Sequence, residues 1–237
     1  MRQVPKYLII GSGRLVFHFC NYLRLLNLSF IQWSRKNNTP LQLKKFSKEC
    51  THVLLLINDD AIEDFVLNNS FLQNKCCVHC SGSLALNNIY SAHPLMTFGK
   101  QPYDLTTYLH MPFILEENSP EFENLLPGLS NKSYKIPGHL KSFYHALCVI
   151  SGNFTCLLWQ KFFSELETTF NLPREIGYPY LKQVVKNLQQ QSPNTLTGPL
   201  VRGDWQTIKA NLDALHNDSY REVYQAFVNV FQNEGEI

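Results

Sequence analysis

The stretch YLIIGSGRLVFHFCNYLRLLNLSFIQWSR, residues 7–35, contains the pattern that decides the fold. An apolar run over Tyr7–Ile10 ends in the turn GSGR, and a second apolar run follows at Phe30–Trp33. Between the runs, apolar residues recur at spacings of three and four, as on one side of an amphipathic helix. They are Leu15, Phe19, Tyr22, Leu23 and Leu26. The stretch therefore predicts a strand, a helix and a second strand.

The same alternation continues through the first half of the chain. Further strands are predicted at Val53–Ile57, Cys77–His79, Tyr90–His93 and Pro112–Leu115. The first of these has no alternation of apolar and polar residues, which is typical of a parallel strand covered on both faces. Asp59 and Asp60 occupy positions suited to a helix N-cap. Strands that alternate with helices predict the α/β class, with a parallel, doubly wound sheet.

The second half of the chain is predicted to be helical. Over residues 140–170 apolar side chains fill most sides of a helix, which predicts the centre of a helical domain or a subunit contact. Other elements are expected near it: a strand at Lys132–Ile136, a helix at Tyr180–Leu188, and helices capped by Asp204 and Asp218. We therefore predict a sheet domain over 1–137 and a helical domain over 138–237.

Composition places the chain among ordinary globular proteins. Of its 237 residues, 44% are hydrophobic and 17% are charged, which excludes a disordered chain. The net charge of +2 is too small to predict nucleic acid or an anionic membrane as the main partner. Neither the apolar region of a signal peptide nor a run of roughly 20 apolar residues is found. We therefore expect a cytoplasmic protein.

Seven cysteines are present, an odd number that argues against a disulfide framework. Free buried thiols in a reducing cytosol are expected instead. Cys77 and Cys80 have a CxxC spacing, but a zinc site needs a second pair of ligands. A strand also directs adjacent side chains to opposite faces. No metal site is therefore predicted.

The turn after the first strand has the residues of a phosphate-binding turn: Gly11, Ser12, Gly13 and Arg14. The first glycine makes the tight turn, and the second lets backbone amides approach a pyrophosphate at the helix N-terminus. These four residues are therefore candidate cofactor contacts. Val16 occupies the third glycine position of the motif, so the helix is expected to pack differently against the strand. The alternative is a strand-helix turn that binds no ligand.

The end of the second strand distinguishes between the two nicotinamide dinucleotides. An NAD site usually has a carboxylate here, which bonds the ribose 2′-hydroxyl. In this chain Ser34 and Arg35 follow the strand, and a guanidinium with a hydroxyl suits the 2′-phosphate of NADP. We therefore predict NADP in preference to NAD. A solvated basic turn is the alternative.

Six segments, in this order, resemble a known group of bacterial proteins. They are GSGR (11–14), LLLINDDAI (54–62), VHCSGSL (78–84), SAHPLMTF (91–98), FYHALCVISGN (143–153) and LTGPLVRGD (196–204). The group joins a Rossmann-like NADP oxidoreductase domain to a helical domain of unknown function. It is similar to pyrroline-5-carboxylate reductases, prephenate dehydrogenases and the wider 6-phosphogluconate dehydrogenase-like superfamily. The resemblance covers nearly the whole chain, and it implies the fold rather than the reaction.

The resemblance implies roles for residues that follow the middle strands. Asn58 and Asp59 stand where such families pass the chain near the adenosine and nicotinamide riboses. Ser81 and Gly82 follow the next strand, at the carboxyl edge where ligands bind in open α/β sheets. These positions extend the candidate cofactor site toward the substrate.

A second set of candidates belongs to the substrate end. His93 resembles the histidine of the His-Pro pair in prephenate dehydrogenases, which contacts the reacting group of the substrate. Tyr144, His145 and Asn153 lie on the long helix expected to face the nucleotide cleft. The last two are eight residues, or two helical turns, apart and are expected on one face. Related hydroxyacid dehydrogenases have a lysine where this chain has Val149, so a lysine-based mechanism is not expected.

Hydride transfer to a carbonyl or imine needs a proton donor near the accepting atom. Histidine suits that task at neutral pH, so His93 and His145 are the two candidates. The alternative is that each histidine only orders a loop. Ser81 and Asn153 complete the predicted catalytic set.

These patterns predict a cytoplasmic, NADP-dependent oxidoreductase that acts on a small, carboxylate-bearing metabolite. Tyr144 and Arg202 are candidate substrate contacts, although Arg202 is equally suited to pairing with Asp204. The apolar excess of the helical domain predicts a homodimer. Two other classes remain open: a nucleotide-binding or interaction protein without activity, and an enzyme that uses another dinucleotide-like cofactor, such as a deazaflavin.

Overall fold

The computed structural model describes residues 6–190 and 196–234. Its contacts divide the chain into two compact units, residues 1–158 and 159–237. This division falls later than the predicted domain boundary at residue 137, because the start of the long helix packs on the sheet of the first unit. The division of functions between 1–137 and 138–237 stays a prediction.

A seven-stranded sheet forms the centre of the first unit, in the order β2-β1-β3-β4-β5-β6-β7. The strands are β1 (Tyr7–Ile10), β2 (Phe30–Trp33), β3 (His52–Leu55), β4 (Cys76–His79), β5 (Tyr90–Pro94), β6 (Phe113–Glu116) and β7 (Ser133–Ile136). Neighbouring strands are parallel except β5 and β6, which are antiparallel. The predicted α/β, Rossmann-like fold is confirmed. The expectation of a wholly parallel sheet is wrong at this one pair, because the chain returns from β5 without crossing back over the sheet.

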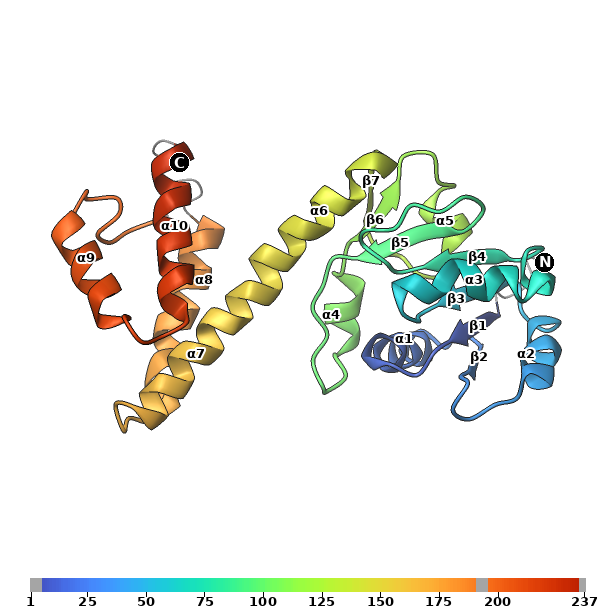
Figure 1. The fold of residues 1–237 in the computed structure, drawn as a ribbon. Coiled ribbons are helices and arrows are strands. Elements are labelled where there is room, and N and C mark those ends of the chain that lie inside the picture. The colour runs from blue at the N-terminus through green and yellow to red at the C-terminus, as the bar shows by residue number, and fades with distance from the viewer. Residues whose placement is uncertain (1–5, 191–195, 235–237) are drawn as a thin grey trace. The chain divides into compact units, whose positions relative to one another are not determined.

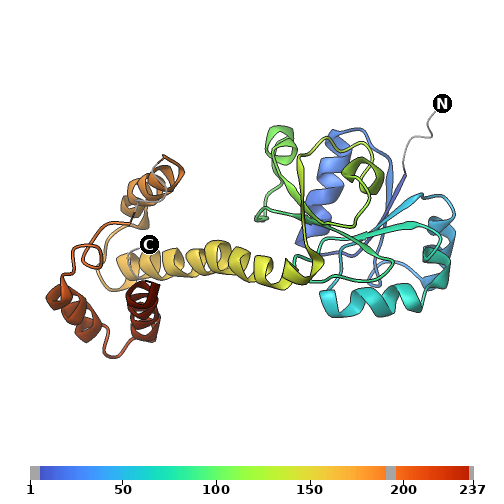
Figure 2. The ribbon, with the colours of Figure 1, turned by 90° about the horizontal axis from the view of Figure 1, so that it is seen from above.

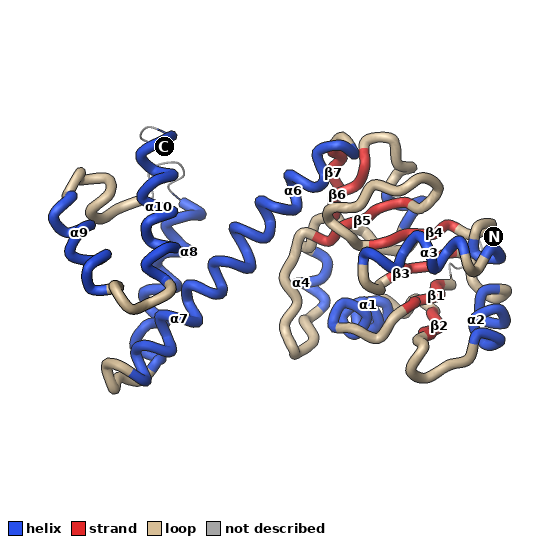
Figure 3. The backbone as a smooth tube through the Cα atoms, in the orientation of Figure 1, coloured by secondary structure: helices blue, strands red, loops and turns tan. Residues whose placement is uncertain are grey.

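Helices cover both faces of the sheet, as in a doubly wound fold. They are α1 (Arg14–Leu25), α2 (Pro40–Ser47), α3 (Ile62–Leu67), α4 (Leu105–Leu109) and α5 (Phe122–Leu125). One face packs Tyr7 and Ile9 against α1, α4 and α5, and the other packs Leu8 and Ile10 against α2 and α3. Adjacent residues of β1 therefore enter opposite cores. Figures 2 and 3 show the strands between the helical layers.

The helix α2 is absent from the sequence prediction, although the residues TPLQ carry its start signal. Thr39 accepts a hydrogen bond from the backbone N–H of Gln42, whose side chain accepts from the N–H of Thr39. Pro40 occupies the first helical position, where its missing N–H costs nothing. Trp33 Nε1 donates to the carbonyl of Thr39 at 2.9 Å and ties this cap to the end of β2.

The chain after β3 also differs from the prediction. A 3₁₀ turn, η1 (Asp59–Ala61), leads into α3, whose N-cap is Ala61. Asp59 and Asp60 therefore do not cap α3. The carboxylate of Asp59 instead accepts a hydrogen bond from Ser81 Oγ at 2.6 Å. Asp59 thus bonds to the side chain of a distant residue and not to the backbone N–H groups at the start of α3.

A long helix begins in the first unit and agrees with the helical pattern predicted over 140–170 (Figure 1). It comprises η3 (Gly138–Leu140), α6 (Lys141–Cys148), the π-helical turn η4 (Val149–Phe154) and α7 (Thr155–Thr168). By length and composition it could cross a membrane, although only 6% of its most apolar stretch is buried. Scattered polar residues interrupt any continuous apolar run, so the sequence prediction of no such segment missed it. Length and composition alone do not distinguish a membrane span from a helix that packs on another protein surface.

The second unit is helical. With the end of α7 it contains η5 (Arg174–Gly177), α8 (Tyr178–Gln190), α9 (Trp205–Ala214) and α10 (Tyr220–Glu234). Asp204 caps α9 as predicted, because its carboxylate accepts from the N–H of Thr207 at 3.1 Å. Asp218 accepts from the N–H of Tyr220 at 2.8 Å and pairs with Lys161 of α7. An aromatic cluster joins α7 to the start of α8 and consists of Trp159, Phe162, Phe163, Tyr178 and Tyr180.

Candidate functional site

A cleft of about 860 Å³ opens at the carboxyl ends of β1, β2 and β3. The strand order reverses direction between β1 and β3, and open α/β sheets bind ligands at such a switch point. The structure brings every predicted cofactor residue to the wall of this cleft: Gly11, Ser12, Gly13, Arg14, Ser34, Arg35, Asn58 and Asp59. Ser81 lies on the same wall. These residues come from four separate loops, so only the fold makes them neighbours.

The two glycines of the turn differ in whether the protein itself excludes a side chain. Gly11 has a φ of +135°, and an added Cβ would lie well under 3.0 Å from the carbonyl oxygen of Leu56. The protein itself therefore requires glycine there. A Cβ added to Gly13 would meet no protein atom within 4 Å. The open space in front of Gly13 leaves room for a ligand to approach the start of α1.

Val16 fits the turn because of Gly11. Its side chain is buried in the core between α1 and the sheet. A Cβ on Gly11 would lie 3.0 Å from Val16 Cγ2. Because Gly11 has no side chain, Val16 of α1 can pack against the end of the strand. The turn therefore differs from one with three glycines, in which the third glycine lets the helix approach the strand.

The basic end of the cleft contains a buried hydroxyl. Ser34 is only 4% exposed, and its Oγ has no hydrogen-bond partner among the described residues. Arg35 follows it on the exposed edge of the same cleft. At the opposite side of the cleft, Arg14 Nη1 donates to the carbonyl of Phe98 at 3.2 Å. An unpartnered buried hydroxyl beside a guanidinium suits an anionic group that enters from the cleft.

Asp59 and Ser81 connect the cleft to a second group of side chains. Ser81 Oγ donates to the carboxylate of Asp59 at 2.6 Å and accepts from the backbone N–H of Leu84 at 3.1 Å. Ser83 Oγ also donates to Asp59, at 3.5 Å. Hydrogen bonds therefore join the loop after β4 to the loop after β3. Gly82 lies in the loop after β4, between Ser81 and Ser83.

The second group contains three of the predicted substrate-end residues. His93 Nδ1 lies 2.8 Å from the hydroxyl oxygen of Tyr144, so one donates to the other. The rings of His93 and His145 lie edge to face, with centroids 5.8 Å apart. A Cβ on Gly82 would clash with His145 and lie 3.1 Å from His93 Cδ2. The two imidazoles and the phenol therefore gather directly against the loop that borders the cleft.

His93 and Tyr144 are both neutral at physiological pH. Burial lowers the pKa of His93 to about 4, and the neighbouring His145 and Lys141 lower it further against the opposing effect of Asp59. Burial also raises the pKa of Tyr144, and its neighbour Cys148 adds to the rise. The pair thus consists of a neutral imidazole and a protonated phenol. In such a pair the imidazole can hand its proton to a ligand and take the phenol proton through the shared hydrogen bond, and water then reprotonates the phenolate.

Asn153 and Arg202 are not brought into this group. Asn153 is exposed and lies in the π-helical turn η4. The expectation that Asn153 shares a face of the helix with His145 stays a prediction. Arg202 is exposed and belongs to the second unit, where its charge acts on the capping residue Asp204. Their predicted roles stay predictions.

Sequence reasoning missed Lys141 and His79. Lys141 is 2% exposed, although lysine is rarely buried. His79 Nδ1 accepts from the N–H of Ser81, and its Nε2 is buried without a partner among the described residues. Burial and the charge of Lys141 lower the pKa of His79 to about 3. One signal could have found Lys141: it precedes Tyr144 and His145 by three and four residues, one helical turn.

The cysteines of β4 do not form a site. Cys77 is buried in one core and Cys80 in the other, on opposite faces of the sheet as the strand geometry predicts. Burial raises the pKa of both thiols. Within residues 6–190 and 196–234, no group of three histidine, cysteine or acidic residues lies close enough to hold a metal ion.

Comparison with known families finds a match in the later part of the chain. Residues 113–230 match the model described as a domain of unknown function, DUF2520. This part of the chain is similar to the DUF2520 family. The match runs from β6 through the long helix to α10 and includes Tyr144 and His145. The DUF2520 segment therefore supplies one side of the imidazole group, and the preceding sheet supplies His93.

Solved structures resemble the whole chain. A Bacteroides fragilis protein whose description proposes an NADP oxidoreductase has 20% identity and a TM-score of 0.76, over 97% of this chain and 98% of that one. A Thermotoga maritima protein has 23% identity and a TM-score of 0.68, over 96% and 97%. The pyrroline carboxylate reductase of Plasmodium falciparum, solved with NADP bound, has 13% identity and a TM-score of 0.60, over 95% and 96%.

At these identities the likeness shows the fold. It confirms the predicted resemblance to Rossmann-like NADP oxidoreductases with a helical C-terminal part. A search of curated protein sequences gave no match.

The two glycines offer a direct test of the cleft. Gly11→Ala should lower the free energy of unfolding by about 2 kcal/mol or more, because it combines a strained φ with a backbone clash. Gly13→Ala should cost less than about 1 kcal/mol, the usual range for an N-cap change, yet weaken NADPH binding at least tenfold. Urea unfolding and a fluorescence titration measure the two effects. A Gly13→Ala protein with unchanged affinity would show that no ligand approaches the turn.

A second test concerns acid stability. In the folded protein His79 and His93 stay neutral down to pKa values of about 3 and about 4, whereas the unfolded chain protonates them near pH 6.5. The unfolded state therefore binds more protons below that pH, and the free energy of unfolding should fall as pH falls from about 6.5 to 4. His79→Asn keeps an acceptor for the Ser81 N–H and should flatten this dependence. The same change at exposed His110 controls for residue type, and an equal slope in both variants would contradict the buried neutral His79.

Proposed function

We propose that this protein is an NADP-dependent oxidoreductase that transfers a hydride to or from a carbonyl or imine of a small, carboxylate-bearing metabolite. One observation carries the proposal: the cleft with the glycine turn and Arg35 reaches Ser81, and the next residue, Gly82, packs against His145 and against His93, the partner of Tyr144. A nucleotide-sized cleft thus lies next to a loop that covers groups able to move a proton. The DUF2520 match and the reductase folds of similar structures support the same class.

The residues of the cleft fit NADP. The turn at Gly13 leaves space in front of the helix start for a pyrophosphate. Ser34 supplies an unpartnered buried hydroxyl and Arg35 a guanidinium, the two groups that a ribose 2′-phosphate needs. Asn58 and Asp59 line the side of the cleft that leads to Ser81. Across the sheet, in the strand order β2-β1-β3-β4, the residues that follow these strands lie in the order of the groups along the dinucleotide.

When bound, NADPH supplies the hydride of the reaction. The chain's own residues then provide the proton. Tyr144 remains a phenol and donates to His93 Nδ1, which leaves the proton of the neutral imidazole on Nε2 to serve the accepting oxygen or nitrogen. A neutral imidazole is a weaker acid than an imidazolium, so its role includes hydrogen bonding to the developing charge as well as proton transfer. His145 packs against His93 and holds it in place.

The remaining predicted roles complete the proposal. Ser81 orients the loop between cofactor and substrate through its bond to Asp59. Asn153 contacts the substrate from the long helix, and Arg202 stays a candidate for binding a carboxylate. The protein works in the cytoplasm.

The proposal is tested by assaying NADPH oxidation with a panel of 2-oxo acids and cyclic imines. We expect turnover with at least one member. Arg35→Ala should raise the Kd for NADPH about 10- to 100-fold, the loss expected for one charge-assisted contact, and leave the Kd for NADH within about twofold. Fluorescence of Trp33 at the cleft wall reports binding.

Lys44→Ala is the matched control, because it removes one exposed positive charge from α2 outside the cleft wall. Equal effects of Arg35→Ala on the two cofactors would contradict the NADP preference. Binding of NADPH without turnover on any compound would favour a nucleotide-binding protein without activity. A purified protein with visible absorbance and no affinity for either nicotinamide cofactor would favour a deazaflavin-like cofactor.

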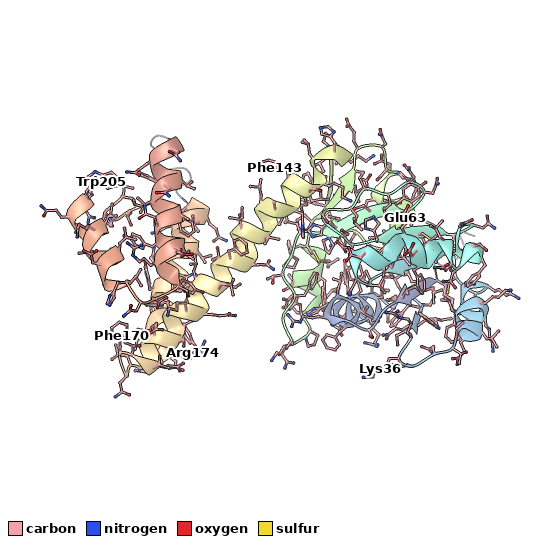
Figure 4. The ribbon with its side chains drawn as sticks, viewed as in Figure 1. Lys36, Glu63, Phe143, Phe170, Arg174 and Trp205 are labelled. Atoms are coloured by element: carbon pink, nitrogen blue, oxygen red, sulfur yellow. The ribbon has the colours of Figure 1, made fainter. Side chains whose placement is uncertain are left out.

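The proposal includes a homodimer formed through the long helix. Six apolar side chains along its first part are exposed, each by more than 40%: Leu140, Phe143, Leu147, Ile150, Phe154 and Leu157. Figure 4 shows the ring of Phe143 standing out from α6. Burying such a stripe in a second copy removes apolar surface from water, which favours association.

Analytical ultracentrifugation of the full chain should give twice the mass of one chain. Phe143→Glu should raise the dimer dissociation constant at least 100-fold, since each copy would lose a buried ring worth about 1.5–3 kcal/mol. Leu41→Glu, at an exposed leucine of α2, is the control. A monomer at micromolar concentration would contradict the dimer, and recovery only in a detergent-extracted membrane fraction would assign the helix to lipid.

A further inference from the structure

Lys141 opens α6 with a fully engaged, buried ammonium group. It is the only lysine among the described residues that is buried. Its Nζ donates to Glu116 Oε1 at 3.2 Å, to Ser91 Oγ and to the carbonyl oxygen of Leu84. An ammonium carries three protons, and this one has three acceptors. The side chain therefore has no donor left for a substrate or a cofactor.

The three acceptors come from three different parts of the first unit. Leu84 belongs to the loop after β4, Ser91 to β5 and Glu116 to the end of β6. Ser91 in turn donates to the carbonyl of Ser81 at 3.4 Å, in the loop that borders the cleft. One side chain thus ties the first turn of α6 to two strands and to that loop. Burying an ion pair is expensive, and an apolar side chain could anchor a helix more cheaply, so the charge points to a role besides stability.

The proton-transfer group lies one helical turn beyond this anchor. Tyr144 and His145 follow Lys141 by three and four residues, which places all three on one face of α6. From that face Tyr144 reaches His93 of β5, two residues after the anchor point Ser91, and His145 covers Gly82. The rotation and height of the first turn of α6 therefore decide whether the phenol meets the imidazole.

We infer that Lys141 is the positioning residue of this site: its bonds to Glu116, Ser91 and Leu84 set α6 so that Tyr144 meets His93. The inference rests on the proposed role of that pair in proton transfer. Lys141 itself touches neither the pair nor the cleft through a hydrogen bond. It acts through the helix, and by its charge it also disfavours protonation of the nearby imidazoles of His93 and His79.

Lys141 shares its surroundings with several titratable groups. Burial lowers the pKa of its ammonium group, and Glu116, Asp59 and Cys80 act against that shift. Toward His93, Lys141 and His145 act in the same direction as burial, and Asp59 acts against them. Removing the ammonium therefore changes both the position of Tyr144 and the electrostatic field at His93, and each change has its own spectroscopic signature.

The test uses the full chain with ¹⁵N-labelled histidine and long-range ¹H–¹⁵N correlation spectra, with the His93 signals assigned from a His93→Gln sample. In the natural protein we expect one hydrogen-bonded neutral tautomer of His93. In Lys141→Met the bond to Tyr144 should be lost and the two tautomers should mix. The pKa of His93 should move upward from about 4. The Kd for NADPH should change less than threefold, because the glycine turn and Arg35 are untouched.

Lys141→Arg keeps the charge and should restore the lower pKa of His93 in part, which a purely space-filling role would not do. Lys135→Met is the matched control, since it breaks an exposed ion pair with Glu121 on the same sheet. Glu116→Gln keeps an acceptor oxygen and removes the partner charge, so it serves as the milder variant if Lys141→Met does not fold. It should weaken the His93 signature in the same direction.

An unchanged tautomer and pKa of His93 in both Lys141→Met and Glu116→Gln would overturn the inference. So would equal changes in Lys135→Met. Failure of the proposed function looks different: the natural protein would then show no NADPH binding or turnover, while the His93 spectra of the variants still report on Lys141.

Discussion

The backbone at Gly11 passes so close to the carbonyl of Leu56 that no side chain fits between them. This approach brings the ends of β1 and β3 together at the point where the strand order reverses. Val16 packs into the space that the glycine leaves, which holds α1 against the sheet with its first turn facing the cleft. The cleft lies directly beside this contact between two backbones, and Gly11, Gly13 and Leu56 all belong to its lining.

Polar groups beyond the cleft are arranged so that most of the buried ones have partners. Ser81 pairs with Asp59, Tyr144 with His93, and the ammonium of Lys141 with three acceptors. The imidazoles in this network remain neutral, because burial and nearby positive charge both oppose protonation. Among the described residues two buried side-chain atoms have no partner, Ser34 Oγ and His79 Nε2. Ser34 belongs to the lining of the cleft, and the other ring nitrogen of His79 accepts from the N–H of Ser81.

The long helix has two kinds of surface. Its start packs on the sheet through Lys141 and Tyr144, while six apolar side chains between Leu140 and Leu157 are exposed. A π-helical turn lies between α6 and α7 and changes the angular spacing of the residues that follow. The contacts divide the chain after residue 158, later than the predicted boundary at residue 137, because the start of this helix packs on the sheet. The predicted alignment of His145 with Asn153 stays a prediction.

Local patterns in the sequence were sufficient for the elements of the sheet, the doubly wound class, the glycine turn and the cap at Asp204, because each depends on neighbouring residues or on a short period. Arg35 could be placed from the sequence for the same reason, since a strand end has a known relation to the turn before it. The sequence did not disclose that Asp59 would leave its helix for Ser81, that β5 and β6 would be antiparallel, or that Lys141 would be buried among three acceptors. Those outcomes depend on contacts between residues 19 to 57 positions apart, and such contacts exist only after the chain has folded.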